Sequence, residues 1–346
     1  MGSVVGREVV FKRLYYFDNI KCLLIFLVVI GHILDVTVVS DHRMAKAAFV
    51  FIYSFHMPLF IFVAGLFTRV EKLTREKALY KVCYFVILGF AAKIIELIVP
   101  AIYAIPISFS LLADSSLPWY MFAIAAYYTM AFLLKQFDMR IILAVSMVLG
   151  LFVGYDSSIG DFLYLSRIIV FFPFFWLGVM LEPEHVESVA KKVPLRIIGI
   201  TAIVLFASVC ILRTSDAYAY RGLFTGRNSF ETVSSAIVGC SWLNRLIAYF
   251  VSAATGIGVL CIIPHSKYPV FITVGTRTLQ IYLLHFPIIL ILKKTGVLAC
   301  VVEFSGSSWL LLIPIAILIA LALSCSLLQK PIALLGAILW KQECKS

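Results

Sequence analysis

Three histidines lie inside strongly apolar stretches of this chain of 346 residues: His32 after CLLIFLVVIG, His56 before MPLFIFVAG, and His285 after TLQIYLL. An ionisable side chain at membrane depth is costly unless it is hydrogen-bonded or used. One such imidazole alone is explained by a hydrogen bond to a neighbouring backbone group, but three near one level indicate a polar cavity. Neutral imidazole can take a proton from a hydroxyl group, so general-base catalysis is chemically available.

Two charged residues open the apolar stretch that carries His32. Asp18 and Lys21 are three positions apart, so they share one helix face and can form an ion pair at the inner membrane boundary. Lys21 and His32 are eleven positions apart, which is about three helical turns and roughly 16 Å of rise. One stripe of this helix is therefore expected to carry Asp18, Lys21 and His32.

The polar segment TRVEKLTREKALYK, residues 68–81, places three basic side chains at three-residue spacing: Arg69, Lys72 and Arg75. Guanidinium forks and lysine ammonium groups bind phosphate and pyrophosphate well, so this segment is interpreted as a phosphate clamp. The alternative is a solvated loop whose positive charge only keeps it on the cytoplasmic side of a membrane.

The composition excludes a soluble globular protein, because 62% of the residues are hydrophobic, only 14% are charged and the mean hydropathy is +1.04. The 29 Lys and Arg against 18 Asp and Glu would suggest nucleic acid in a polar chain. Here the basic residues gather in short loops between apolar runs, as membrane topology requires, so no nucleic-acid partner is expected. No metal site is expected either, since the histidines lack ligand spacing.

Apolar runs long enough for tilted or short membrane spans divide the whole chain. The pattern predicts an all-α, polytopic integral membrane protein with about ten transmembrane helices, forming a single domain over residues 1–346. With the N-terminus inside, the inner loops hold 16 Lys and Arg and the outer loops hold 7, which places both termini in the cytoplasm. The expected spans are residues 17–39, 47–67, 79–99, 118–135, 140–155, 163–181, 195–213, 243–263, 270–292 and 308–339.

The longest polar segment, residues 213–236, falls on the outer side under this topology. It is rich in Tyr, Arg, Asn, Ser and Gly. That mixture suits contact with hydroxylated ligands, and it equally suits a solvated connector.

Several of these segments together resemble the membrane-bound acyltransferase-3 family, and most closely its branch related to fucose 4-O-acetylases. Each segment alone is an apolar sequence of low specificity for the family. Taken together, in this order and spacing, the segments cover nearly the whole chain. They are YFDNIKCLLIFLVVIGH (16–32), SFHMPLFIFVAGLF (54–67), LPWYMFAIAAYY (117–128), FFPFFWLGVML (171–181) and VGTRTLQIYLLHFP (274–287).

The resemblance implies ten transmembrane helices in the plasma membrane and the transfer of an acyl group, usually acetyl from acetyl-CoA, to a hydroxyl of a surface or lipid-linked glycan. It implies no permanently bound cofactor. The partners expected are acetyl-CoA, a glycan hydroxyl acceptor and membrane lipids. The first helix of the family usually carries Arg, ten residues and then His. Here Lys21 takes the arginine position, which keeps the charge and loses the bidentate fork.

The same resemblance assigns roles to the polar residues. His32 is expected to be the catalytic histidine, acting with Lys21 and Asp18. Acetyl-CoA is expected to bind Arg69, Lys72 and Arg75. The residues expected to bind the acceptor or to orient His32 are His56, His285, Trp119 and Arg167.

A different class of function competes with acyl transfer. Intramembrane His, Lys and Glu can form a proton relay, and helices interrupted by proline can form a substrate site, so a proton-coupled transporter of a small polar solute is the alternative. The crowding of charge at the cytoplasmic edge and the lack of a visible inverted repeat favour the acyltransferase.

Overall fold

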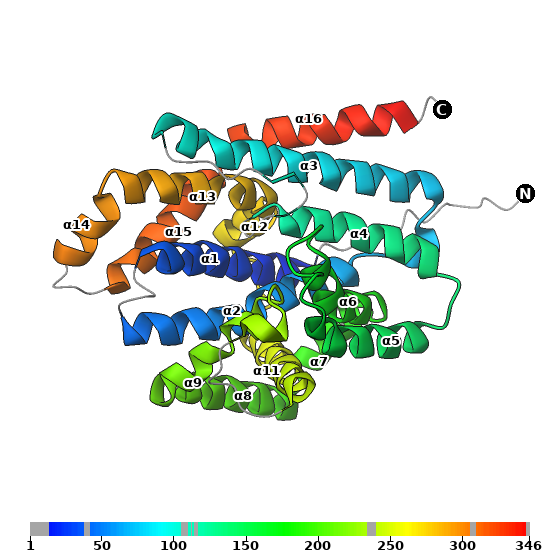
Figure 1. Cartoon of the computed structure of the whole chain (residues 1–346). Coiled ribbons are helices and arrows are strands. Elements are labelled where there is room, and N and C mark those ends of the chain that lie inside the picture. Colours follow the sequence, from blue (N-terminus) through cyan, green and yellow to red (C-terminus); the bar gives the residue numbers. More distant parts are fainter. Residues whose placement is uncertain are drawn as a thin grey trace, which may run out of the picture.

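A computed structural model describes residues 14–37, 42–104, 110–111, 113, 117–233, 240–304 and 309–343 (Figure 1). Within them every regular element is a helix, and no β-strand occurs. In order the elements are α1 (Tyr15–Thr37), α2 (Arg43–Leu66), η1 (Val70–Lys72), α3 (Arg75–Ile102), α4 (Trp119–Leu134), α5 (Met139–Phe152), η2 (Val153–Tyr155), α6 (Leu165–Val179), α7 (Pro183–Ala190), α8 (Val193–Leu212), α9 (Thr214–Ala219), α10 (Arg221–Phe224), η3 (Phe230–Thr232), α11 (Ser241–Ile262), α12 (Pro269–Gly275), α13 (Thr278–Lys294), α14 (Val297–Phe304), η4 (Trp309–Leu311), α15 (Leu312–Leu323) and α16 (Ser326–Glu343).

Five helices are long and apolar enough to cross a membrane: α1, α2, α3, α8 and α11. The number rises to eight if each of three bent helix pairs counts as one span. These five to eight candidate spans fit a membrane protein and are fewer than the ten predicted. Two further apolar helices, α4 and α5, are shorter, with 16 and 14 residues.

The candidate spans differ in how deeply they lie in the bundle. In its most apolar window α2 is 72% buried, whereas α8 is only 11% buried although its mean hydropathy is 2.5. Figure 1 shows α3 with α16 along one side, α8 with α9 along the other, and α1 and α2 between them. Exposed apolar surface of this extent is stable against lipid, so α8 is a lipid-facing helix and α2 a central one.

Two stretches predicted as single helices are each broken into two. Residues 270–292 fall on α12 and α13, which meet at 77°, and the described part of 308–339, from Trp309 on, forms η4, α15 and α16, with a bend of 56°. A break leaves backbone carbonyls without helical partners. Here Gln280 Nε2 donates to the carbonyls of Leu323 at 2.6 Å and Cys325 at 2.8 Å, while Arg277 Nη1 donates to that of Ser324 at 2.6 Å. The start of α13 thus caps the break between α15 and α16.

The central helix α2 crosses α6 at a pair of glycines. A Cβ atom on Gly178 would overlap the carbonyl oxygen of Phe62, and one on Gly65 would overlap that of Phe175. Backbones approach this closely in membrane proteins where small residues face each other. The crossing fixes α2, which carries His56, against α6, which carries Arg167.

Pro58 interrupts the hydrogen-bond ladder of α2 beside His56. Proline has no N–H, so the carbonyl four residues earlier, that of Ser54, loses its helical donor. Ser252 Oγ on α11 donates to this carbonyl at 2.5 Å. The irregular turn that presents His56 is therefore covered by protein, as backbone at membrane depth must be.

Candidate active site

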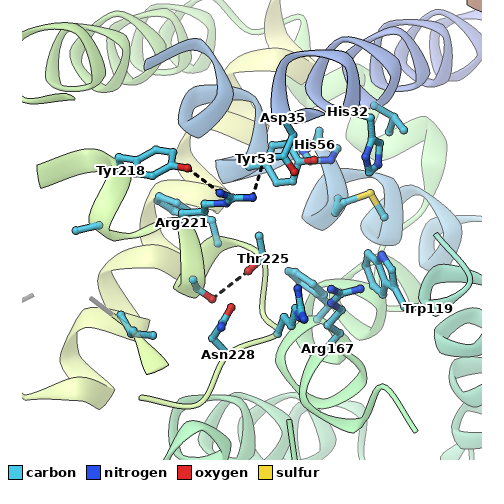
Figure 2. A pocket seen from close by; sticks show the side chains of 18 of the residues that line it. His32, Asp35, Tyr53, His56, Trp119, Arg167, Tyr218, Arg221, Thr225 and Asn228 are labelled. Atoms are coloured by element: carbon cyan, nitrogen blue, oxygen red, sulfur yellow. Dashed lines mark hydrogen bonds and ion pairs between the residues drawn. The ribbon is translucent and has the colours of Figure 1, made fainter. Parts of the chain in front are cut away.

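A cavity of about 550 Å³ lies between the C-terminal half of α1, the middle of α2 and the segment that follows α8 (Figure 2). Its size is ordinary for a small-molecule site. Four of the residues singled out in the sequence line it: His32, His56, Trp119 and Arg167. The structure thus brings together side chains from α1, α2, α4 and α6.

Hydrogen bonds set the ring orientation of two of the three histidines. His56 Nδ1 lies 2.8 Å from the carbonyl oxygen of Ile52, and His285 Nδ1 lies 3.0 Å from that of Ile281. A carbonyl only accepts, so Nδ1 carries the hydrogen in both rings, and Nε2 of the neutral ring is left as an acceptor. His56 therefore has one nitrogen available to take a proton in the cavity that it lines.

The imidazole ring of His32 lies close to the ring side chains of three other residues. Its ring centroid is 5.2 Å from that of His285, 5.5 Å from that of Phe286 and 6.5 Å from that of Tyr53. Among the residues described, none forms a hydrogen bond with the His32 imidazole, so both of its nitrogens are available to a ligand. His285 is fully buried behind His32 and lies outside the cavity lining.

The far wall of the cavity comes from the polar segment after α8, together with the end of α1. Arg221 Nη2 donates to Asp35 Oδ1 at 2.7 Å, and Arg221 Nη1 donates to the hydroxyl of Tyr218 at 2.7 Å. Figure 2 shows Arg221 between these two partners and Asn228 beyond it. Of the two interpretations of residues 213–236, contact with a ligand is the one that this position favours, over its described part up to residue 233.

Some lining residues were missed in the sequence: Asp35, Tyr53, Tyr218, Arg221, Arg227 and Asn228. A signal existed for two of them. Asp35 follows His32 by three positions and Tyr53 precedes His56 by three, so each shares the face of its helix that carries the histidine. The others come from a segment that sequence alone does not fold back onto α1.

A second cavity, of about 160 Å³, lies beside the first and is mostly apolar. The two cavities share Met57 and Tyr282 in their walls. On α1, Ile25 lines the second cavity and Val28 lines the first, seven and four positions before His32. One face of α1 therefore lines the apolar cavity at Ile25 and the polar cavity at Val28 and His32.

The other predicted site residues lie toward the opposite end of α1 and outside both cavity linings. Lys21 Nζ forms an ion pair with Asp18 Oδ1 at 2.8 Å, as the spacing predicted. Arg69, Lys72 and Arg75 are exposed around η1 and the start of α3. The structure does not bring these five residues together with His32, and about 16 Å of helix rise separates Lys21 from it.

Among the described residues, no group of three or more His, Cys, Asp or Glu side chains could hold a metal ion.

A family model described as an acyltransferase domain matches residues 14–329. No curated protein and no solved structure matches the chain. The match covers α1 to the start of α16, and with them every residue that lines either cavity.

Proposed function

The chain belongs to the acyltransferase-3 family, and from this premise we propose that it is a membrane O-acetyltransferase. It moves acetyl from acetyl-CoA to a hydroxyl of a cell-surface polysaccharide or a lipid-linked glycan precursor, in the manner of the branch related to fucose 4-O-acetylases. We place it in the plasma membrane with both termini in the cytoplasm. Counting α4 and α5 with the eight candidate spans gives the ten crossings of this proposal.

The observation that supports the chemistry best is the pairing of His32 with His56 in one polar cavity. O-acylation needs a base for the acceptor hydroxyl and a site from which water is largely excluded. An imidazole takes the hydroxyl proton as the oxygen attacks the thioester carbonyl carbon. The C–S bond then breaks, the proton passes to the leaving sulfur, and CoA departs as a thiol while the ester stays on the acceptor.

A donor for the developing oxyanion is also at hand. The Tyr53 hydroxyl lines the same cavity and forms no hydrogen bond within the described part of the chain. Tyr53 lies near both His32 and His56, with ring centroids 6.5 Å and 4.8 Å away. In this proposal His32 is the base, Tyr53 donates to the oxyanion, and His285 holds the His32 ring from behind.

The donor arm enters along the face of α1 that carries Lys21, Ile25, Val28 and His32. The apolar cavity at Ile25 suits the pantetheine arm, and the polar cavity at Val28 suits the thioester and the acceptor. Leu24, one position before Ile25, is fully buried and lines neither cavity.

Replacing Val28 with tryptophan is expected to lower kcat/KM for acetyl-CoA by about tenfold or more, because the indole fills the passage at the boundary of the two cavities. Val204→Trp on α8 is the matched control, since Val204 is 55% exposed on the lipid-facing helix. Steady-state kinetics on the two purified variants checks this. Undiminished transfer by a folded Val28→Trp protein would rule out the passage along α1.

Removing the basic charges of the 68–81 segment tests where CoA is held. The triple variant Arg69→Ala, Lys72→Ala, Arg75→Ala is expected to raise KM for acetyl-CoA about tenfold or more and leave KM for the acceptor unchanged, because a charge-assisted hydrogen bond to phosphate contributes roughly 1.5–3 kcal/mol. The control removes the exposed charges of Arg140 and Lys192. An unchanged KM for acetyl-CoA in the triple variant would mean that the segment does not bind CoA and that its positive charge only keeps it on the cytoplasmic side.

The function as a whole is tested by comparing glycan O-acetyl content, measured by NMR, between a strain with the intact gene and one lacking it. Loss of one O-acetyl signal, restored by the gene, is the expected result. Unchanged acylation of every envelope glycan, together with pH-driven solute uptake by proteoliposomes of the purified protein, would instead support the transporter.

A further inference from the structure

We propose that the acceptor sugar carries an anionic group, a carboxylate or a phosphate, and that Arg227 and Arg167 bind it while a hydroxyl of the acceptor faces His32. This inference rests on the proposed function for the identity of the ligand. The site itself is argued from the charges and contacts of the polar cavity.

The charge of the cavity lining is unbalanced. Three arginines line it, Arg167, Arg221 and Arg227, against one carboxylate, Asp35. Asp161 stands just behind, in an ion pair with Arg227. Among the described residues this places three guanidinium groups around two carboxylates. Such a lining attracts an anion to the arginine side of the cavity.

The guanidinium group of Arg221 is held in the wall of the cavity by neighbouring side chains. Besides its hydrogen bonds to Asp35 and Tyr218, its guanidinium carbon lies 4.8 Å from the centroid of the Phe49 ring and 5.6 Å from that of Tyr218. A guanidinium group that is hydrogen-bonded on two sides and lies over two aromatic rings stabilises the wall of the cavity. The ligand-binding charge must therefore come from the other two arginines.

Arg227 is held in a way that leaves its outer end available. Its Nε donates to both oxygens of Asp161, at 3.0 Å and 2.8 Å. Neither of its two terminal nitrogens forms a hydrogen bond to a residue within the described ranges, and the side chain is 39% exposed. A guanidinium anchored through Nε still offers a fork, which fits the oxygens of a carboxylate or a phosphate.

Arg167 adds a second positive charge nearby. It is 6% exposed and its guanidinium carbon lies 4.9 Å from the centroid of the Trp119 ring. It also lies within electrostatic range of Arg227, which repels it, and of Asp161, which attracts it. Two guanidinium groups in the wall of one cavity attract an anion more strongly than either does alone.

The arrangement sets the orientation of a ligand. In Figure 2 Arg167 and Asn228 lie on one side of the cavity, while His32, His56 and Tyr53 lie on the other. The ring of Trp119 also lines the cavity and offers an apolar face to a sugar. An anionic group bound at the arginines would thus turn a hydroxyl of the same sugar, or of its neighbour, toward His32.

The test compares ligands that differ in charge alone. Purified protein is equilibrated with D-glucuronate, with its neutral isostere D-glucuronamide, and with D-glucose and glucose 6-phosphate, and binding is measured by equilibrium dialysis. The charged ligands are expected to bind about tenfold or more tightly than the neutral ones. Tighter binding of glucuronate alone would identify a carboxylate as the anion, and tighter binding of glucose 6-phosphate alone a phosphate.

Three variants locate the effect. Arg227→Gln is expected to abolish the preference for charge, whereas Asp161→Asn, which breaks the same ion pair but keeps the arginine, retains it. Arg213→Gln is the matched control, because Arg213 lies outside the cavity lining in an exposed ion pair with Asp216. Equal binding of glucuronate and glucuronamide by the native protein, or a preference that survives in Arg227→Gln, would overturn the anion site.

Acetyl transfer to the same sugars separates this inference from the function on which it rests. Transfer from radiolabelled acetyl-CoA with no preference for the charged sugar would leave the acyltransferase in place and reject the anionic acceptor. Arginine-dependent binding of glucuronate without acetyl transfer to any sugar would retain the anion site and reject the acceptor role given to it.

Discussion

Replacing His32 with glutamine is expected to lower acetyl transfer by ~10²–10⁴-fold, the usual scale for removal of a general base. Glutamine occupies a similar volume and can hydrogen-bond, but its amide cannot accept the hydroxyl proton. His32 lines the cavity, and its replacement breaks no hydrogen bond among the described residues. Single-turnover transfer from radiolabelled acetyl-CoA measures the effect on chemistry directly.

The neighbouring histidines sharpen this test. His56→Gln reports whether the second imidazole in the cavity is the base, since its Nε2 is also left as an acceptor. His285→Gln is expected to lower the rate less, because His285 lies behind His32 and outside the lining. His185→Gln on α7, at an exposed position, is the neutral control. Near-normal turnover by His32→Gln with a large loss in His56→Gln would transfer the role of base to His56.

Replacing Gly178 with valine is expected to prevent the assembly of a stable protein. A Cβ atom at this position overlaps the Phe62 carbonyl of α2, and backbone cannot turn aside as a flexible side chain can. Overpacking of a core typically costs roughly 1–3 kcal/mol, and a forced separation of two helix backbones lies at the upper end of that range or beyond. The folded yield after detergent extraction and the Tm of the remaining protein measure the loss.

Gly256→Ala on α11 is the matched control for that variant. The nearest side-chain atom to a Cβ at Gly256 is Leu59 Cδ1, at 4.0 Å, which is ordinary contact. This variant is expected to keep the native yield and Tm, since alanine also favours helix over glycine. If Gly178→Val matched Gly256→Ala in yield and Tm, the crossing of α2 and α6 would not be as close as the structure places it.

The apolar helices and the histidine cluster could be predicted from sequence because both rest on local signals. Hydropathy over about 20 residues marks a span, and the positions of His32 and His285 fix their depth along two such spans. The breaks at residues 276–277 and 324–325 could not, because a few polar residues inside an apolar run do not by themselves mark a bend between two helices. The break between α15 and α16 is stabilised by donors from the other broken pair, Arg277 and Gln280, which are distant in sequence from the carbonyls they cap.

The composition of the polar wall suited ligand contact, but its position beside α1 and α2 could not be predicted from sequence. Tyr218 and Arg221 reach the cavity only because α9 and α10 fold back against α2. The ion pair of Arg221 with Asp35 joins residues 186 positions apart, a contact that no local pattern encodes. The resemblance to the family gave His32 its expected role, but it named neither Arg221 nor Arg227.

The capping of one broken span by another also bears on the order in which the molecule can be made. The ribosome releases α13, with Gln280 and His285, before it has synthesised the carbonyls of Leu323 and Cys325 that Gln280 binds. Until those residues are inserted, the start of α13 lacks these carbonyl partners, and the helix that carries His285 has only the contacts that it makes with earlier elements such as α1 and α3. A nascent chain halted before residue 323 therefore holds every residue of the polar cavity in covalent order and still lacks the finished site. The structure is therefore completed late in translation, by a part of the chain that lines neither cavity.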